Sequence, residues 1–128
     1  MLRKLIVVGV LVALLVPLAA AAALAAQVVR CTDVLPCVAS GDWDRVFERR
    51  GDGLRDDIRL RGGHDLVLAN KYTRDTDVVS GGKGRDKINV ADKDTLDTAN
   101  GGRGHDTCIV DARRELGTSC AKVIIRRN

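Results

Sequence analysis

Small and medium apolar residues recur along the middle of the chain, each at the second position after an aspartate. The aspartates are Asp44, Asp56, Asp65, Asp77, Asp86, Asp97 and Asp106, and the apolar residues that follow them are Val46, Ile58, Val67, Val79, Ile88, Ala99 and Cys108. Because side chains alternate between the two faces of a strand, this pattern predicts short strands that turn all of these apolar residues inward.

The spacing of the aspartates predicts how these strands are arranged. Successive aspartates are 12, 9, 12, 9, 11 and 9 residues apart, so the steps taken two at a time are 21, 21, 21, 20 and 20 residues. A nearly constant double step is expected if two short strands and two turns form one coil. Alternate aspartates then stack on one edge, with Asp44, Asp65, Asp86 and Asp106 on the first edge and Asp56, Asp77 and Asp97 on the second.

Two glycine-rich segments repeat almost letter for letter on the first edge. Residues 81–90 read GGKGRDKINV and residues 101–110 read GGRGHDTCIV, and both fit the pattern G-G-x-G-x-D-x-U-x-V with U apolar. Glycine tolerates backbone conformations that a side chain disfavours, so these segments predict tight turns that lead into strands. The turns of the second edge are longer and mostly lack glycine.

This motif resembles the nonapeptide of the hemolysin-type (RTX) calcium-binding repeat family. The resemblance covers about residues 41–110 and is strongest at 81–90 and 101–110. It implies an all-β fold, a right-handed parallel β-roll or β-solenoid, here of about three coils with disulfide-pinned terminal caps. It also implies an exported bacterial protein that holds calcium in its turns and often folds only when calcium is present.

Carried onto this sequence, the resemblance implies calcium ligands in the glycine-rich turns. Calcium takes about six to eight oxygen ligands, which is more than one turn supplies, so we expect a site between two turns stacked one coil apart. The predicted main site comprises Gly81, Gly82, Gly84, Asp86, Gly101, Gly102, Gly104 and Asp106. A second predicted site places Gly62, Gly63 and Asp65 against the turn at 81–86.

A metal-free β-solenoid is the alternative interpretation of the aspartate ladder. The carboxylates would then cap turns by accepting hydrogen bonds from backbone N–H groups. This explains the glycine-poor edge of Asp56, Asp77 and Asp97 better than calcium binding does, whereas the glycine-rich edge favours calcium.

The amino terminus has the three parts of a secretory signal peptide. A basic start at Arg3 and Lys4 precedes an apolar run from Leu5 to Leu18, and an alanine-rich end follows at Ala19–Ala26. Cleavage after Ala25 is predicted, and the alternative is an uncleaved membrane anchor. The predicted organisation is therefore a signal peptide at 1–25, an amino-terminal cap at 26–40, calcium-binding repeats at 41–110 and a carboxy-terminal cap at 111–128.

Four cysteines in an exported chain predict disulfides, and three pairings are possible. We favour the two local pairs, Cys31–Cys37 and Cys108–Cys120, with one at each end of the repeats. A zinc site with His64 or His105 is the alternative, but the spacing resembles no zinc finger or ribbon.

The carboxy-terminal cap has two predicted parts. Residues 112–116 predict a helical turn, and the apolar residues 123–125 are expected to cover the last coil.

The charge and composition of the chain disfavour two classes of function, nucleic-acid binding and catalysis. The sequence has 21 basic and 17 acidic residues, so a chain without Arg3 and Lys4 carries a net charge of +2. One Trp, one Tyr and one Phe offer little for stacking on nucleic acids, and no H-E-x-x-H or G-x-S-x-G motif indicates an enzyme. We therefore expect a secreted calcium-binding repeat protein with no nucleic-acid partner and no membrane contact after cleavage. The alternative is a secreted, metal-free interaction module for a cell surface or protein, with no partner indicated.

Overall fold

The computed structural model of this chain describes residues 27–31, 36–48 and 55–127. The predicted signal peptide at 1–25 lies outside the described residues, as do residues 32–35 of the predicted amino-terminal cap and residues 49–54 of the repeats. Over the described ranges, no helix has the length and apolarity needed to cross a membrane.

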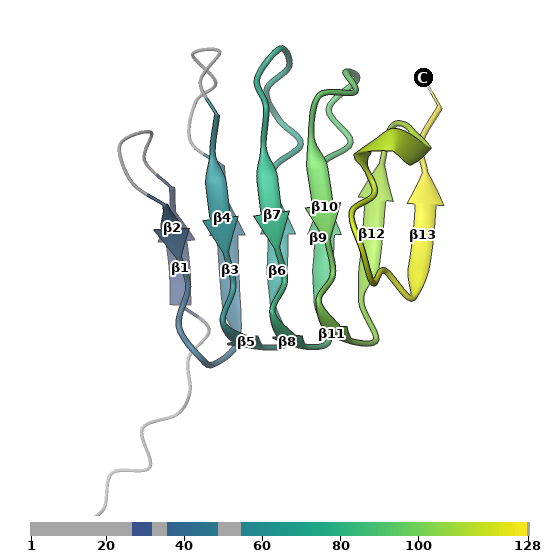
Figure 1. Cartoon of the computed structure of the whole chain (residues 1–128). Coiled ribbons are helices and arrows are strands. Elements are labelled where there is room, and N and C mark those ends of the chain that lie inside the picture. The colour runs from purple at the N-terminus through teal and green to yellow at the C-terminus, as the bar shows by residue number, and fades with distance from the viewer. Residues whose placement is uncertain (1–26, 32–35, 49–54, 128) are drawn as a thin grey trace, which may run out of the picture.

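The chain winds into a stack of coils whose strands form three parallel sheets, called A, B and C below (Figure 1). Sheet A orders β1 (Gln27–Arg30), β3 (Asp44–Phe47), β6 (Leu66–Leu68), β9 (Lys87–Asn89), β12 (Thr107–Val110) and β13 (Lys122–Ile125). Sheet B orders β2 (Cys37–Val38), β4 (Asp57–Arg59), β7 (Val78–Ser80) and β10 (Thr98–Asn100). Sheet C orders β5 (Gly62–Gly63), β8 (Lys83–Gly84) and β11 (Arg103–Gly104). The predicted parallel β-solenoid is thus confirmed, with about four turns where the sequence predicted about three coils.

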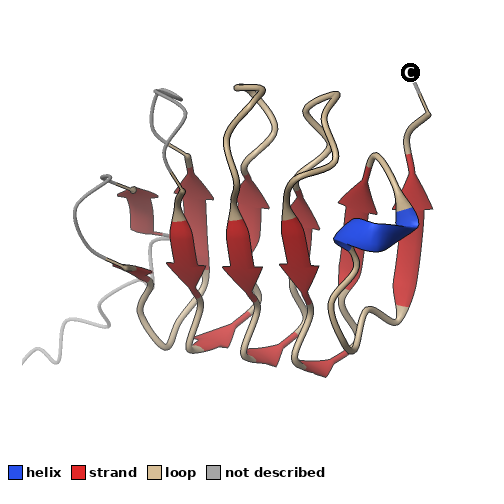
Figure 2. Ribbon diagram, turned by 45° about the horizontal axis from the view of Figure 1, so that its top comes forward, coloured by secondary structure: helices blue, strands red, loops and turns tan. Residues whose placement is uncertain are grey.

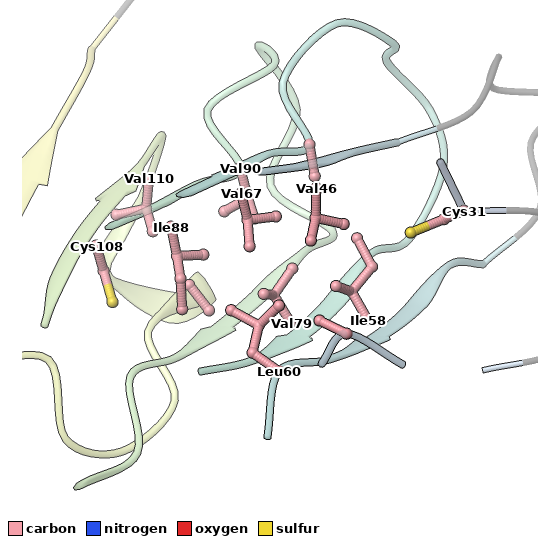
Figure 3. Close-up of a cluster of buried hydrophobic side chains, with 13 residues drawn as sticks. Cys31, Val46, Ile58, Leu60, Val67, Val79, Ile88, Val90, Cys108 and Val110 are labelled. Carbon is pink, nitrogen blue, oxygen red and sulfur yellow. The ribbon is translucent and has the colours of Figure 1, made fainter. Parts of the chain in front are cut away.

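The core is built around the apolar residues that the aspartate spacing singled out, joined by six more buried residues: Cys31, Ala39, Leu60, Ala69, Val90 and Val110. All seven residues that follow the aspartates are 0% exposed: Val46, Ile58, Val67, Val79, Ile88, Ala99 and Cys108. They stack in register, with Val46 beside Val67 and Ile88 beside Cys108 in sheet A. Figure 3 shows Val46, Val67 and Ile88 of sheet A facing Ile58 and Val79 of sheet B. Because neighbouring coils place similar side chains one above another, the core is a narrow column of small and medium residues.

The turns between sheets B and A form a third sheet, which the two-strand coil inferred from the sequence did not include. In sheet C, Gly63 pairs with Gly84 and Gly84 pairs with Gly104. These three glycines have φ values of 120°, 136° and 145°, which residues with a Cβ rarely adopt. The glycine pattern therefore allows a short backbone ladder where the sequence predicted only a turn.

The two edges of the solenoid differ in construction, and Figure 2 shows them on opposite sides of the strands. The glycine edge comprises the short turns that contain sheet C and lead into sheet A. The loop edge comprises the longer connections from sheet A to sheet B, at residues 69–77 and 90–97, together with the carboxy-terminal segment Asp111–Leu116. In Figure 1 the glycine edge lies at the bottom and the loop edge at the top.

Each end of the solenoid carries one of the two predicted disulfides, Cys31–Cys37 and Cys108–Cys120. After β12, the predicted helical turn is the 3₁₀-helix η1 (Arg113–Glu115). The apolar strip at 123–125 lies in β13, which pairs with β12 and so covers the outer edge of the last coil in sheet A. Ile125 packs against the core, whereas Val123 is 41% exposed.

Removal of the carboxy-terminal disulfide is expected to destabilise the protein. The double substitution Cys108→Ser and Cys120→Ser opens a loop with a sequence separation of 12, and chain entropy predicts a loss of about 3 kcal/mol in the free energy of unfolding. The matched double substitution of Cys31 and Cys37 opens a loop with a sequence separation of 6, so its expected loss in the free energy of unfolding is smaller, about 2 kcal/mol. Urea unfolding of both variants checks this order, and a larger loss at the amino-terminal pair would contradict it.

Candidate metal centre

The aspartates of the glycine edge stack as predicted and hold neighbouring coils together. Oδ1 of Asp65 accepts the backbone N–H of Asp44 at 2.7 Å, Oδ1 of Asp86 accepts that of Asp65 at 2.9 Å, and Oδ1 of Asp106 accepts that of Asp86 at 2.8 Å. These carboxylates are buried. One oxygen of each therefore serves as a hydrogen-bond acceptor for the preceding coil.

The second oxygen of each of these carboxylates is buried and has no hydrogen-bond partner, at Asp65, Asp86 and Asp106 alike. At Asp86 and Asp106 this oxygen lies against the first glycine of the same motif. A Cβ added to Gly81 would stand 2.7 Å from Oδ2 of Asp86, and one added to Gly101 would stand 2.8 Å from Oδ2 of Asp106. The structure thus brings together the first glycine and the aspartate of each full motif.

The remaining glycines of the motif have a packing role. A Cβ on Gly84 would stand 1.7 Å from the carbonyl oxygen of Gly63, and one on Gly104 would stand 1.6 Å from that of Gly84. The Gly63 carbonyl also accepts the N–H of Arg85 at 3.3 Å. Close stacking of coils therefore requires these glycines whether or not an ion is bound, and calcium binding at the predicted glycine-edge sites stays a prediction.

The aspartates of the loop edge also cap turns, as the alternative interpretation predicted. Oδ1 of Asp77 accepts the N–H of Asp56 at 3.3 Å, and Oδ1 of Asp97 accepts the N–H of Asp77 at 2.8 Å. The same hydrogen bond occurs on both edges. Turn capping is therefore a general feature of this solenoid and does not distinguish a metal-binding edge from a structural one.

The loop edge gathers more carboxylates than the repeat pattern indicated. Three groups bring one ligand atom per residue within 4.8 Å of one another: Glu48, Asp75 and Asp77; Asp75, Asp92 and Asp94; and Asp94, Asp97 and Glu115. Neighbouring groups share Asp75 and Asp94, so they form one row along this edge. Sequence analysis missed Glu48, Asp75, Asp92, Asp94 and Glu115, because these residues lie in connections without a constant register. The only signal was the unusual density of acids in those connections.

Backbone N–H groups hold these loop carboxylates in place. Oε1 of Glu48 accepts the N–H groups of Lys71 and Tyr72, the latter at 3.0 Å. Oδ1 of Asp92 accepts the N–H of Asp94 at 2.9 Å. In both residues the other carboxylate oxygen is buried and lacks a hydrogen-bond partner.

Burial and mutual repulsion raise the pKa values of the loop-edge acids. Burial, with repulsion from Asp75 and Asp97, raises the pKa of Asp77 to about 9. Burial raises the pKa of Asp97 to about 8 and that of Asp92 to about 6. Within the described part of the chain the only ion pair joins Arg59 to Asp57, away from these groups. Asp77, Asp92 and Asp97 are therefore crowded by other carboxylates, and no ion pair between described residues involves these three side chains.

Burial also raises pKa values at the glycine edge, although the pKa of Asp86 stays below those of Asp77 and Asp97. Burial is the main cause that raises the pKa of Asp86 to about 7, and it also raises the pKa of Asp65. Crowding is thus greatest at the loop edge, where the connections add acids to the ladder.

The donor set of the three groups suits a hard cation. Every member offers carboxylate oxygen and none offers nitrogen or sulfur, which favours Ca²⁺ or Mg²⁺ over zinc. All four cysteines are in disulfides, so no thiolate is available for zinc. The two disulfides also fit an oxidising environment.

Comparisons with known proteins give no further guide, because no protein-family model, no curated protein and no solved structure matches this chain.

Proposed function

We propose that this chain is a secreted calcium-binding protein in which the bound ion stabilises the β-solenoid. The observation that carries the proposal is the row of carboxylate groups at the loop edge, where buried oxygens of Asp92, Asp97 and Glu115 have no hydrogen-bond partner. A buried anion is costly unless it is paired or coordinates a metal. Cation binding would remove that cost, and export rests on the predicted signal peptide together with the disulfides.

Calcium fits these groups better than magnesium. Calcium accepts irregular sets of carboxylates, backbone carbonyls and waters, whereas magnesium needs nearly ideal octahedral geometry and gives up its waters reluctantly. The loop-edge carboxylates come from connections of unequal length, which favours an ion with flexible coordination. Extracellular calcium modules typically have dissociation constants of about 0.1–1 mM, so such a site is expected to need calcium at about millimolar concentration.

The expected contribution of calcium is to stability, because an ion that binds the folded chain alone favours folding by mass action. At about ten times its dissociation constant, one site adds about 1.4 kcal/mol to the free energy of unfolding. For a domain of this size that corresponds to a rise of about 6–11 °C in melting temperature. Several sites would add their contributions.

A calcium titration of the oxidised protein tests the proposal. We expect the melting temperature, followed by circular dichroism, to rise in millimolar calcium relative to chelator, and isothermal titration calorimetry to show heat of binding. Magnesium at the same concentration should produce a much smaller rise. An unchanged melting temperature with no binding heat would refute calcium-dependent stabilisation.

A metal-free interaction module is the second candidate, and one surface feature favours it. A groove of about 530 Å³ on the outer side of sheet A is lined by the largely apolar side chains of Val28, Phe47, Leu68 and Tyr72, together with basic and polar residues and Glu48. Val28 is 60% exposed. This function becomes the leading one if the protein proves equally stable in chelator and in calcium.

A further inference from the structure

The carboxy-terminal segment Asp111–Leu116 lies against the last complete coil at the loop edge. Leu116 forms a parallel bridge with Ala99 of β10, and η1 precedes it. This placement brings Glu115 beside the connection from β9 to β10. Ligand atoms of Glu115, Asp94 and Asp97 then lie within 4.8 Å of one another.

Glu115 is an unusual side chain for a turn near the end of a chain, because it is 0% exposed. Its Oε2 accepts two hydrogen bonds, from the N–H groups of Asp111 and Ala112, both at 2.7 Å. Its Oε1 is buried and has no hydrogen-bond partner. The two backbone bonds fix the position of this carboxylate, one oxygen of which lies in the group with Asp94 and Asp97.

The other two members of this group are fixed in the same way. Oδ1 of Asp97 accepts the N–H of Asp77 at 2.8 Å, and its buried Oδ2 has no hydrogen-bond partner. Oδ1 of Asp94 accepts the N–H of Leu96 at 2.8 Å, and its Oδ2 accepts the N–H of Arg74 at 2.6 Å. Hydrogen bonds of this kind orient metal ligands before the ion arrives.

The basic side chains of the same segment do not neutralise the group. Arg114 donates a hydrogen bond to the hydroxyl of Thr95, and the described residues contain no ion pair that involves Asp94, Asp97 or Glu115. Three carboxylates thus converge without a counter-ion, and two of them keep a buried oxygen without a hydrogen bond.

We propose that Asp94, Asp97 and Glu115 form a calcium site that fastens the carboxy-terminal segment Asp111–Leu116 to the last complete coil. The site rests on the proposed function, in that it takes the same ion. It differs from the sites implied by the glycine motifs because it lies on the opposite edge and uses a residue from outside the repeats. Backbone carbonyls and waters would complete the coordination.

Calcium at this site has a local consequence. Residues 111–116 are held to the solenoid by the ion as well as by the bridge between Leu116 and Ala99. We therefore expect calcium to slow amide hydrogen exchange in residues 111–117 more than in the middle coils. The Cys108–Cys120 disulfide keeps the segment near the coil in either state, so the change is one of protection and not of release.

Glu115→Gln is the decisive variant. The amide oxygen can still accept the N–H groups of Asp111 and Ala112, and the amide nitrogen can donate to an oxygen that lacks a partner. In chelator we expect this variant to be at least as stable as the wild type, because one buried negative charge is gone. In calcium we expect one ion fewer to bind, a smaller rise in melting temperature and no added protection of residues 111–117.

Asp94→Asn provides a second variant, since Asp94 is only half-buried and its replacement is expected to disturb the fold less than that of a fully buried acid. It should also weaken one calcium-binding event by at least tenfold in calorimetry. Asp57→Asn is the matched control, because Asp57 pairs with Arg59 on the surface and belongs to no carboxylate group. This control should bind calcium as the wild type does.

The outcomes separate this site from the proposed function. If the wild type gains no stability from calcium, the proposed function fails and the site fails with it. If the wild type responds and Glu115→Gln and Asp94→Asn respond equally, calcium stabilises the protein from elsewhere and the site at the carboxy-terminal segment is refuted. If only Asp106→Asn loses the calcium-induced rise in melting temperature, the ion binds at the glycine edge, and the proposed site at the carboxy-terminal segment is likewise refuted.

Discussion

Replacing Gly84 with alanine is expected to destabilise the protein by about 4 kcal/mol, a large share of the roughly 5–15 kcal/mol that holds a typical domain folded. Gly84 has φ of 136°, and an added Cβ would stand 1.7 Å from the carbonyl oxygen of Gly63. A left-handed backbone costs a residue with a Cβ about 1–2 kcal/mol, and overpacking adds about 1–3 kcal/mol. The contacting atom belongs to the backbone of a stacked coil, so it cannot move aside cheaply.

Gly62→Ala is the matched control, because Gly62 lies in the same strand as Gly63 but tolerates a Cβ. The nearest atom would be the carbonyl oxygen of Lys83 at 3.5 Å, an ordinary contact, and its φ is not positive. Urea unfolding of both variants should be measured in chelator and in calcium. Destabilisation of Gly84→Ala in both conditions supports the packing role, whereas a loss seen only in calcium would show that the glycine serves the ion alone.

The stability of the calcium-free protein is expected to fall as the pH rises from about 5 to 9. Burial and repulsion among Glu48, Asp75, Asp77 and Asp97 raise the pKa of Asp77 to about 9, and the pKa of Asp97 is raised to about 8. The unfolded chain loses these protons near its ordinary pKa of 3.8, while the folded chain retains them. The folded state thus binds more protons across this range, so the free energy of unfolding decreases with pH.

The expected size of this pH effect is considerable. Even a difference of two pKa units between the folded and unfolded chains is worth about 3 kcal/mol. Urea unfolding in chelator at pH 5, 7 and 9 measures it, and the absence of free cysteines prevents thiol exchange at the alkaline end. A free energy of unfolding that rises steadily to pH 9 in chelator would contradict the buried-carboxylate account.

Calcium should change the pH profile in a specific way. The ion competes with protons for carboxylates, so its stabilising effect should be larger at pH 8 than at pH 5. Asp77→Asn should flatten the profile in chelator, because it removes the group whose pKa is raised most. Asp57→Asn serves as the control, since its partner Arg59 lowers the pKa of Asp57, and it should leave the fall between pH 5 and 9 in place.

Local chemistry explains why the coil pattern could be predicted from the sequence. Each aspartate accepts a backbone N–H of the neighbouring coil, and the apolar residue two positions later faces inward because strand side chains alternate. Any break in this spacing would displace a buried carboxylate and a core residue together. For that reason the sequence alone predicted the coil period, the inward positions such as Ile88 and Val67, and the stacking of the aspartates. The local cysteine pairs followed from their positions at the ends of the repeats.

The sequence by itself therefore determined the parallel coil, its core and the two edges, because these depend on contacts that recur with a constant spacing. Only the tertiary structure decided which acids meet at the loop edge. Glu48, Asp75, Asp94 and Glu115 come from connections of different length, and their proximity depends on how those connections fold over the coil ends. The short sheet C was also decided in three dimensions, because it forms only when glycines of successive coils approach closely enough to pair. The spacing of residues along the chain does not predict contacts between connections of unequal length or the close approach of successive coils.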